Sequence, residues 1–328
     1  MLHLLGMGHS HPSIEIDNKF IEDLDIGTTA DWIIEKIGIK TRLSSLPLDY
    51  IEATRNQDPR AAFEVATHTP TDLGVEASEM ALKRAGLKAA DIGLVIANCC
   101  TPRQTTPSEA QRIAGRLDLQ VPAYDVFSAC PIFALHLDIL NSYKEEKLPD
   151  YILCVSTATL TQKVDYNDRS AAAIWGDGAA AYIVSPRQRG KLAILDTHFT
   201  ADPTRCDAVT VDTFGHFGQD GRAVRGFSVR QTVRLLKQLE QEHDLSWDND
   251  AFVGHQANAT MLTQICNNRS IPDKSHWHNV VGIGNQAGAG APATISMQWD
   301  QIEPGVRVAV AVVGAGLSWG STLLEAVK

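Results

Sequence analysis

Amphipathic helices that lead into apolar strands occur in both halves of this sequence. In the first half, Asp72–Ala85 has apolar residues at helical spacing, stops at Gly86 and leads into the apolar run Ile92–Ala97. In the second half, the amphipathic stretch Val229–Leu239 precedes the apolar strand Asp250–Gly254. A chain that alternates such helices with buried strands is predicted to adopt an α/β fold.

Further segments extend this plan in each half. Strands are also predicted at Leu2–Gly8, Asp150–Ser156, Gly176–Val184, Val306–Val313 and Ser321–Ala326. The matching order predicts an internal duplication, with two sheets packed through shared central helices. We place the two halves at residues 1–185 and 186–328.

Composition and charge exclude several classes of function. The six cysteines lack the spacing of zinc sites or disulfide frameworks, so we expect a reducing, cytoplasmic compartment. No stretch approaches the roughly 18 apolar residues of a membrane span, and Met1–Gly8 lacks the basic region of a signal peptide. A net charge of −10 argues against nucleic-acid and acidic-membrane partners. The histidines of His9–His11 and His276–His278 lack a suitably spaced third ligand, so no metal is expected.

The stretch Tyr124–Leu135 is the best candidate for a reactive site. A short strand pattern, Tyr124–Phe127, is followed by two small residues, Cys130, and an apolar helix from Pro131 onward. Cys130 is therefore predicted at a strand-to-helix turn, where the unpaired N–H groups of the helix favour a thiolate over a thiol. The alternative is an inert core cysteine, because free Cys is among the most buried residue types.

Two further residues have side chains that suit acyl transfer. His255 follows a predicted strand at its C-terminal tip, where α/β proteins usually build their sites. Asn285 lies in the small-residue turn Gly284–Pro292, before a predicted helix. Taken singly, either residue has an ordinary structural interpretation. A cysteine, a histidine and an asparagine from three separate units together suit acyl transfer through a thioester.

The whole sequence resembles β-ketoacyl-acyl carrier protein synthase III, a condensing enzyme of the thiolase superfamily. The matching segments follow the family's order: Thr29–Arg42, Thr106–Ile113, Ser128–Cys130, Asp168–Ala179, Gly254–Asn258, Gly284–Ala289 and Gly314–Ser321. The resemblance implies a five-layered αβαβα thiolase fold, a homodimer, and Cys130, His255 and Asn285 as the catalytic residues. It also implies an oxyanion hole made by the backbone N–H groups of Cys130 and Ala315.

The resemblance further implies two half-reactions. Cys130 attacks an acyl thioester, taken to be acyl-CoA, and becomes acylated. A malonyl-type thioester on CoA or on a carrier protein then loses CO2, and the enolate that forms attacks the acyl group. His255 and the Asn285 amide stabilise that enolate as donors, each worth about 3–4 kcal/mol. No cofactor is expected, because the CoA thioester is itself the substrate.

Some substrate-binding positions differ from the family pattern. Trp32 is the candidate that stacks on the CoA nucleotide, with Lys36 near the phosphates where the family often has arginine. Thr106 replaces a bulky aromatic residue that often reaches the partner subunit's pocket, and Ile132 replaces a glycine. These departures predict a reshaped acyl pocket.

Other departures concern the pantetheine channel and the carrier protein. Arg222 and Arg225 lie where the family commonly has Gly-Asn; they either pair with a carboxylate or phosphate, or lie on a solvated face. Asn258 is also assigned to substrate binding. The helix that follows it, Ala259–Arg269, carries one positive charge where the family usually has a basic docking surface. An acidic carrier protein would find little attraction there.

Three functions remain open from the sequence. The favoured one is an acyltransferase of the ketosynthase III type that catalyses decarboxylative condensation in specialised lipid or polyketide metabolism. A second is an acyltransferase of the same fold that passes the Cys130 acyl group to an amine, a hydroxyl or a small-molecule nucleophile, with His255 as general base. A third is an inactive partner subunit, against which the three catalytic residue types argue.

Overall fold

The computed structural model describes residues 1–327. Their long strands are hydrogen-bonded side by side in one continuous sheet. Their order is β11-β12-β13-β8-β1-β7-β6-β4-β5. The first-half strands are β1 (His3–Ser10), β4 (Leu94–Cys99), β5 (Ala123–Asp125), β6 (Ile152–Thr159) and β7 (Asp177–Ser185). The second-half strands are β8 (Leu192–Ala201), β11 (Ala251–Gly254), β12 (Arg307–Gly314) and β13 (Ser318–Ala326).

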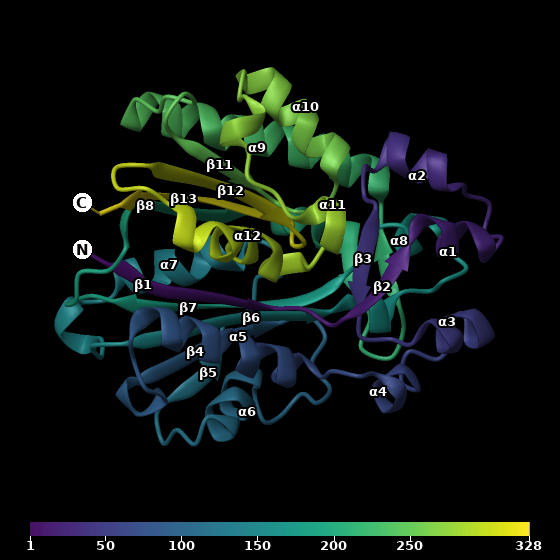
Figure 1. The fold of residues 1–328 in the computed structure, drawn as a ribbon, viewed down its shortest axis with the longest axis horizontal. Coiled ribbons are helices and arrows are strands. Elements are labelled where there is room, and N and C mark those ends of the chain that lie inside the picture. Colours follow the sequence, from purple (N-terminus) through teal and green to yellow (C-terminus); the bar gives the residue numbers. More distant parts are fainter. Residues whose placement is uncertain (328) are drawn as a thin grey trace.

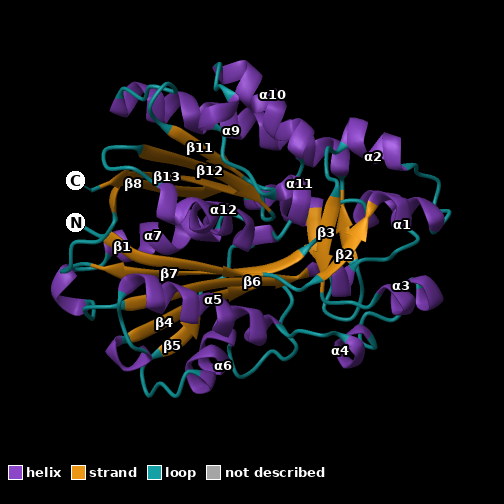
Figure 2. Cartoon of the chain, viewed as in Figure 1, coloured by secondary structure: helices purple, strands orange, loops and turns teal. Residues whose placement is uncertain are grey.

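Five layers are visible in Figure 1, and Figure 2 shows the strands sandwiched between helices. The outer layer on the first-half strands is formed by α5 (Pro70–Ala85) and α6 (Glu109–Arg116). The middle layer is formed by α7 (Ile132–Ser142) and α12 (Gly290–Gln298), which contact strands of both halves. The opposite outer layer consists of α9 (Gly221–His243) and α10 (Ala259–Arg269). This is the αβαβα thiolase fold.

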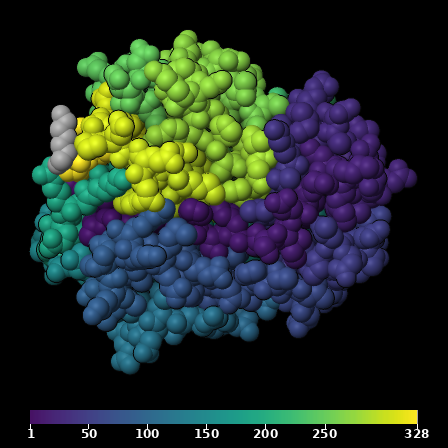
Figure 3. All heavy atoms as spheres, in the orientation of Figure 1, coloured from purple at the N-terminus to yellow at the C-terminus, as the bar shows by residue number. Residues whose placement is uncertain are grey.

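Shorter elements complete the described chain. They are β2 (Ile14–Asp17), α1 (Asn18–Asp23), α2 (Ala30–Lys36), β3 (Thr41–Ser44), α3 (Leu48–Thr54), α4 (Ala62–Val65), α8 (Arg169–Ala172), β9 (Val209–Val211), β10 (Phe217–Gln219) and α11 (Val280–Ile283). β2 pairs with β3, and β9 pairs with β10. In Figure 3 the first-half segments, in purple and blue, and the second-half segments, in green and yellow, form adjoining parts of one surface.

Strand direction follows a similar plan in the two halves. The outer pairs β4–β5, β4–β6 and β11–β12 are parallel, whereas β6–β7, β7–β1, β12–β13 and β13–β8 are antiparallel. The expectation of two separate sheets needs a correction, because β1 also pairs with β8 through His3–Ala193 and Leu4–Leu192. A short connection after Ser185 returns the chain beside its own first strand. The division at residues 185 and 186 stays a prediction.

The middle layer explains why two helices of this sequence are apolar on nearly every side. α7 buries Phe133, Leu137 and Leu140, and α12 buries small residues together with Ile295. Both helices belong to one core that includes apolar side chains from both sets of strands. Burial between the first-half and the second-half strands leaves no solvent-facing stripe, so a helix there does not need the polar face of an ordinary surface helix.

Several element boundaries differ from the sequence predictions. The helix α2 is capped by the Thr29 hydroxyl, which accepts from the Trp32 N–H at 3.2 Å. Pro131 is the N-cap of α7 and does not lie in its first turn. α9 extends far beyond the predicted stretch because the Asp220 carboxylate accepts from the Ala223 N–H at 3.1 Å and so caps an earlier start. β8 was not predicted.

Within the described part of the chain, no helix has the length and apolar character needed to cross a membrane.

Candidate active site

Cys130 lies at the turn between β5 and α7. The backbone continues from β5 along β4, with the Val126 N–H donating to the Ala97 carbonyl at 2.8 Å. Ala129 then adopts a left-handed conformation with φ of +45°, which reverses the chain within one residue. The partly buried cysteine is therefore held at the start of the central helix, as the sequence predicted.

The end of β12 packs directly against this turn. A Cβ atom on Gly314 would lie 2.7 Å from the Cβ of Cys130 and 2.7 Å from the Cδ of Pro131. Only glycine allows such a close approach of the two backbones. The approach brings Ala315 beside the thiol, so that the backbone N–H groups of Ala315 and Cys130 both hydrogen-bond the sulfur.

Burial dominates the electrostatics of Cys130. Removal from water raises the pKa of this thiol well above its ordinary value, and the neighbouring Cys100 adds to the effect. The N–H groups of Ala315 and Cys130 lower the pKa, but by less than burial raises it. The expectation that the helix terminus favours a thiolate is therefore wrong for the resting site. The thiol is neutral because desolvation of the charged form outweighs the backbone dipoles.

His255 follows β11 at the C-terminal edge of the second-half strands and is 7% exposed. Burial lowers its pKa to about 4, so the imidazole is neutral at physiological pH. The next residue fixes this turn: the Gln256 amide donates to the Gly254 carbonyl at 2.9 Å and accepts from the Asn279 N–H at 2.9 Å. The hydrogen bonds of the Gln256 side chain thus fix the backbone that carries His255.

Asn285 is held in the turn before α12 by three hydrogen bonds. Its N–H donates to the Ile174 carbonyl at 2.9 Å, and its carbonyl accepts from the Gly176 N–H at 3.1 Å. Its side-chain Oδ1 accepts from the Ala287 N–H at 2.9 Å. Because the amide oxygen is engaged, the Nδ2 group is left as the donor that the side chain can offer to a ligand.

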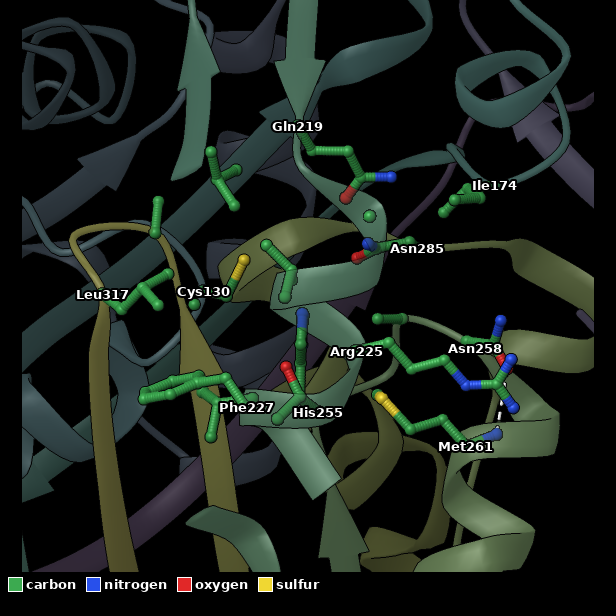
Figure 4. A pocket seen from close by; sticks show the side chains of 18 of the residues that line it. Cys130, Ile174, Gln219, Arg225, Phe227, His255, Asn258, Met261, Asn285 and Leu317 are labelled. Atoms are coloured by element: carbon green, nitrogen blue, oxygen red, sulfur yellow. Dashed lines mark hydrogen bonds between the residues drawn. The ribbon is translucent and has the colours of Figure 1, made fainter. Parts of the chain in front are cut away.

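Cys130, His255 and Asn285 line one cavity of about 150 Å³. Figure 4 shows the three side chains around the same space, with Leu317 and Phe227 along one side. The remaining lining residues are Ile174, Trp175, Val209, Phe217, Gln219, Gly221, Val224, Arg225, Ser228, Ala257, Asn258, Met261, Val313, Gly314 and Ala315. A thiol, a neutral imidazole and a carboxamide donor thus face a mostly apolar space, in which hydrogen bonds to a developing charge are strong.

The predicted substrate-binding residues fall in different places. Asn258 lines the cavity, and its Oδ1 caps α10 by accepting from the Met261 N–H at 2.9 Å. Arg222 is exposed on the first turn of α9 and is not among the lining residues, whereas Arg225 is. Thr106 is exposed in the loop between β4 and α6 and does not line the cavity. Their roles in substrate binding stay predictions.

Trp32 and Lys36 lie on α2. The Arg169 guanidinium stands over the Trp32 ring, 5.0 Å from its centroid, and donates to the Gly27 carbonyl at 2.7 Å. The exposed Lys36 ammonium pairs with Glu35 at 2.5 Å. Arg169 was not predicted to be a site residue, although it lies in the segment Asp168–Ala179 that resembles the family. At this separation the arginine and the indole contact each other, so together they present a flat, cationic surface on which an aromatic group such as a nucleobase can stack from outside.

Sequence reasoning also missed most of the cavity wall. Phe217 and Gln219 come from the short strand β10, and Val224, Phe227 and Ser228 come from the first turns of α9. The available signal was the helical spacing of Val224 and Phe227 ahead of the predicted helix. Neither residue type carries chemistry that would mark it as part of a site.

One group of potential metal ligands lies within the described chain, away from the cavity lining. Ligand atoms of Asp196, Glu242 and His243 all lie within 4.8 Å of one another. The His243 Nε2 and an Asp196 oxygen are 3.0 Å apart, so this group already forms a hydrogen-bonded pair. The expectation of a reaction that uses no metal and no cofactor stays a prediction.

Comparisons with known proteins agree with this arrangement. Residues 124–203 match the family described as 3-Oxoacyl-[acyl-carrier-protein (ACP)] synthase III, and residues 239–326 match its C-terminal counterpart. The sequence is 29% identical over 335 residues to a β-ketoacyl-[acyl-carrier-protein] synthase III of Allorhizobium ampelinum, covering 98% of each chain. It is 26% identical over 326 residues to that of Aquifex aeolicus, again covering 98% of each chain.

Solved structures show the same fold. The crystal structure of 3-oxoacyl-[acyl-carrier-protein] synthase III from Aquifex aeolicus has a TM-score of 0.87 at 25% identity, covering 99% of this chain and 100% of that one. A tetronic acid condensing enzyme has a TM-score of 0.87 at 18% identity, covering 99% of this chain and 100% of that one. The second likeness concerns the fold alone. The first matched segment contains Cys130, and the second contains His255 and Asn285.

Proposed function

Because the chain belongs to the β-ketoacyl synthase III-like condensing enzymes of the thiolase superfamily, we propose that it joins an acyl group to a malonyl-type thioester through an acyl-Cys130 intermediate. Cys130, His255 and Asn285 are the proposed catalytic residues. The observation that carries this proposal is their convergence, from three elements far apart in the sequence, on one cavity. Specialised lipid or polyketide metabolism is the proposed setting.

The first half-reaction loads the cysteine. The Sγ of Cys130 attacks the carbonyl carbon of acyl-CoA, the bond between that carbon and the CoA sulfur breaks, and the thiol proton ends on the departing CoA sulfur. Negative charge develops on the carbonyl oxygen during the attack. The backbone N–H groups of Cys130 and Ala315, which already point at the sulfur, are the proposed donors to this oxyanion.

The second half-reaction forms the new carbon–carbon bond. A malonyl thioester loses its carboxylate as CO2, and the electron pair of the broken bond becomes an enolate whose charge lies on the thioester oxygen. The neutral His255 and the Nδ2 of Asn285 donate hydrogen bonds to that oxygen. The enolate carbon then attacks the acyl carbonyl, the bond between that carbon and the Cys130 sulfur breaks, and the thiolate takes a proton from water.

The low pKa of His255 favours condensation over the alternative acyl transfer to an amine or a hydroxyl. A general base works best when its pKa lies near the operating pH. Burial brings the pKa of His255 to about 4, which makes it a weak base but an effective neutral donor. A hydrogen-bond donor is what an enolate requires, and the Asn285 amide offers a second one.

Acyl-CoA is the proposed acyl donor, and its nucleotide is proposed to bind at α2. The Trp32 ring and the Arg169 guanidinium form a flat, cationic surface there, and Lys36 lies one turn away from Trp32 on the same helix. We place the reaction in the cytoplasm, since all six cysteines are free. No cofactor takes part in the proposed steps.

A homodimer is proposed through the exposed edge of β5. Among the described residues, β5 pairs only with β4, so its other edge is unpaired. Tyr124 is 38% exposed and Phe127 is 67% exposed beside that edge. An unpaired strand with exposed aromatic side chains is suited to pairing with a second copy.

The test separates the two half-reactions. We expect His255→Ala and Asn285→Ala each to reduce malonyl-CoA decarboxylation by about 10²–10³-fold, since each removes one preorganised donor. Acylation of Cys130 by acyl-CoA, followed by intact-protein mass, should remain detectable in both. The exposed residues His278 and Asn249 provide matched alanine controls. Full condensation activity in the two cavity variants would refute the proposed roles.

A further inference from the structure

His11, the residue directly after β1, contacts the turn that carries Asn285. Its Nε2 lies 2.7 Å from the Oε1 of Gln286, which follows Asn285 in the chain and is 275 positions away from His11. Burial lowers the pKa of His11 to about 4, so the imidazole is neutral and has a single ring N–H. Because an amide oxygen only accepts, this N–H is on the Nε2 and donates to Gln286.

The contact with His11 is the hydrogen bond that holds the Gln286 side chain. Gln286 is fully buried, and its Nε2 has no hydrogen-bond partner among the described residues. The pair is packed closely on β7, since a Cβ atom on Gly178 would lie 2.6 Å from the Gln286 Oε1 and 2.8 Å from the His11 Cδ2. Loss of the His11 donor would leave both polar atoms of a buried amide unpaired, which favours a rearrangement of this side chain.

The backbone next to Gln286 determines the orientation of the Asn285 amide. Ala287 has a left-handed conformation with φ of +47°, which is unfavourable for alanine and persists only where neighbouring contacts hold it. The N–H of Ala287 donates to the Asn285 Oδ1 at 2.9 Å. The direction of the Asn285 amide therefore depends on the position of a backbone group whose conformation is itself disfavoured.

These contacts connect His11 to the cavity that contains Cys130. Figure 4 shows the Asn285 side chain at this cavity, together with Cys130 and His255. A displaced Gln286 would move the Ala287 N–H, and the Asn285 amide that follows this N–H would turn away from its present direction. The Asn285 Nδ2, the donor proposed for the enolate, would then no longer point at the position where the charge develops.

We propose that His11 and Gln286 are positioning residues that orient the Asn285 amide for decarboxylation of the malonyl-type thioester. This inference rests on the proposed condensing function and adds two residues to it, neither of which lines the cavity. Within residues 1–327, no hydrogen bond joins the pair to Cys130 or to the backbone of Ala315. The pair is therefore expected to act on the second half-reaction, whereas the loading of Cys130 continues without it.

The test uses variants that differ in one hydrogen bond. His11→Leu removes the donor, and His11→Gln keeps an N–H that can reach the same acceptor. His9→Leu is the matched control: His9 is partly buried near the same end of β1, and its Nδ1 lies 2.9 Å from the hydroxyl of Ser296, which belongs to α12. The kcat and KM would be measured for decarboxylation of malonyl-CoA, and acylation of Cys130 by acyl-CoA would be followed by intact-protein mass.

We expect His11→Leu to lower the kcat of decarboxylation about tenfold, which is less than the 10²–10³-fold loss expected when a donor is removed outright. The KM for malonyl-CoA should change by less than about threefold, because a donor that acts on the developing charge affects mainly kcat. Acylation of Cys130 should also stay within about threefold of the wild type. His11→Gln should recover most of the lost rate, and His9→Leu should match the wild type.

A second variant removes the same hydrogen bond from the acceptor side and provides the test if His11→Leu does not fold. Gln286→Met should reduce the kcat of decarboxylation by a similar factor and leave acylation intact. The double variant His11→Leu/Gln286→Met should lose no more than either single variant, because all three break one shared contact.

Four results would overturn the positioning proposal. They are wild-type decarboxylation by His11→Leu and Gln286→Met, equal losses of decarboxylation and acylation, a loss in His11→Leu that His11→Gln does not repair or that His9→Leu reproduces, and failure of both single variants to fold. Absence of decarboxylation by the wild type, or full decarboxylation by Asn285→Ala, would instead overturn the proposed condensing function and the role of Asn285 in it.

Discussion

Substitution of Gly314 by alanine should disable Cys130 while leaving the protein folded. The added Cβ would lie 2.7 Å from the Cβ of Cys130, 2.7 Å from the Cδ of Pro131 and 3.1 Å from the Cys130 nitrogen. These neighbours belong to the backbone, to a proline ring and to the first carbon of a short side chain, so no flexible group can move aside. The turn that carries the thiol must shift by roughly 0.5–1 Å, and a misplacement of about 1 Å costs on the order of 10²-fold in rate.

The cost to stability should be smaller than the cost to activity. Overpacking of this kind costs about 1–3 kcal/mol, against a total stability of about 5–15 kcal/mol for a typical domain. The variant should therefore keep the wild-type circular dichroism spectrum and a cooperative unfolding transition. Its acylation by acyl-CoA, followed by intact-protein mass over time, should be about 10²-fold slower.

Gly282→Ala provides the matched control for this experiment. A Cβ at Gly282 would meet no atom within 4 Å, and the residue does not adopt a left-handed conformation. Acylation of that variant should proceed at the wild-type rate. If Gly314→Ala were also acylated at the wild-type rate, the close packing of β12 on the Cys130 turn would not position the nucleophile, and the reasoning would be refuted.

Three other predictions follow from burial and from the ring contact on α2. Because burial raises the pKa of Cys130, its alkylation by iodoacetamide should still accelerate with pH above pH 8, and a rate that levels off by pH 7 would contradict the neutral resting thiol. Burial lowers the pKa of His136 to about 3 in the folded protein, against about 6.5 unfolded, so only the unfolded chain takes up this proton as the pH falls below 6.5. The free energy of unfolding, measured with denaturant at pH 6.5 and at pH 5, should therefore fall by about 2 kcal/mol more in the wild type than in His136→Phe. Equal losses in the two proteins would contradict the buried neutral imidazole. Trp32→Ala and Arg169→Ala should each raise the KM for acyl-CoA about 3–30-fold and leave the KM for acyl-pantetheine unchanged. Equal effects on both substrates would argue against nucleotide stacking.

Local sequence patterns predicted most of the architecture. Asp72–Ala85 is a helix in the structure, within α5, because its apolar spacing agrees with its Thr69–Asp72 capping box and with the left-handed Gly86 at its end. The fully apolar runs form buried strands in the structure, as their local pattern predicted. β8 was missed because its residues are only partly buried from Leu195 onward, so it lacks the continuous apolar run by which buried strands were recognised.

The sequence predicted which residue types form the site, but it did not predict the protonation state of the thiol. The turn at Cys130, the strand-end position of His255 and the glycine-rich turn of Asn285 were each visible in short stretches of sequence. The protonation of the thiol was not, because it depends on how much of the chain covers Cys130. That cover comes from segments distant in the sequence, including the end of β12 at Gly314, which packs directly on Cys130. Local sequence reports the dipole of a helix terminus, whereas desolvation is set by the whole fold.

The most direct measurement of the central claim is a two-step mass experiment on the wild type and on Cys130→Ala. Incubation with an acyl-CoA panel should give an acyl adduct on the peptide that contains Cys130, and only in the wild type. Addition of malonyl-CoA, or of the malonyl-loaded carrier protein, should then remove the adduct and release a β-ketoacyl thioester and CO2. A folded wild type that forms no adduct, or an adduct that persists after the malonyl thioester is added, would contradict the account.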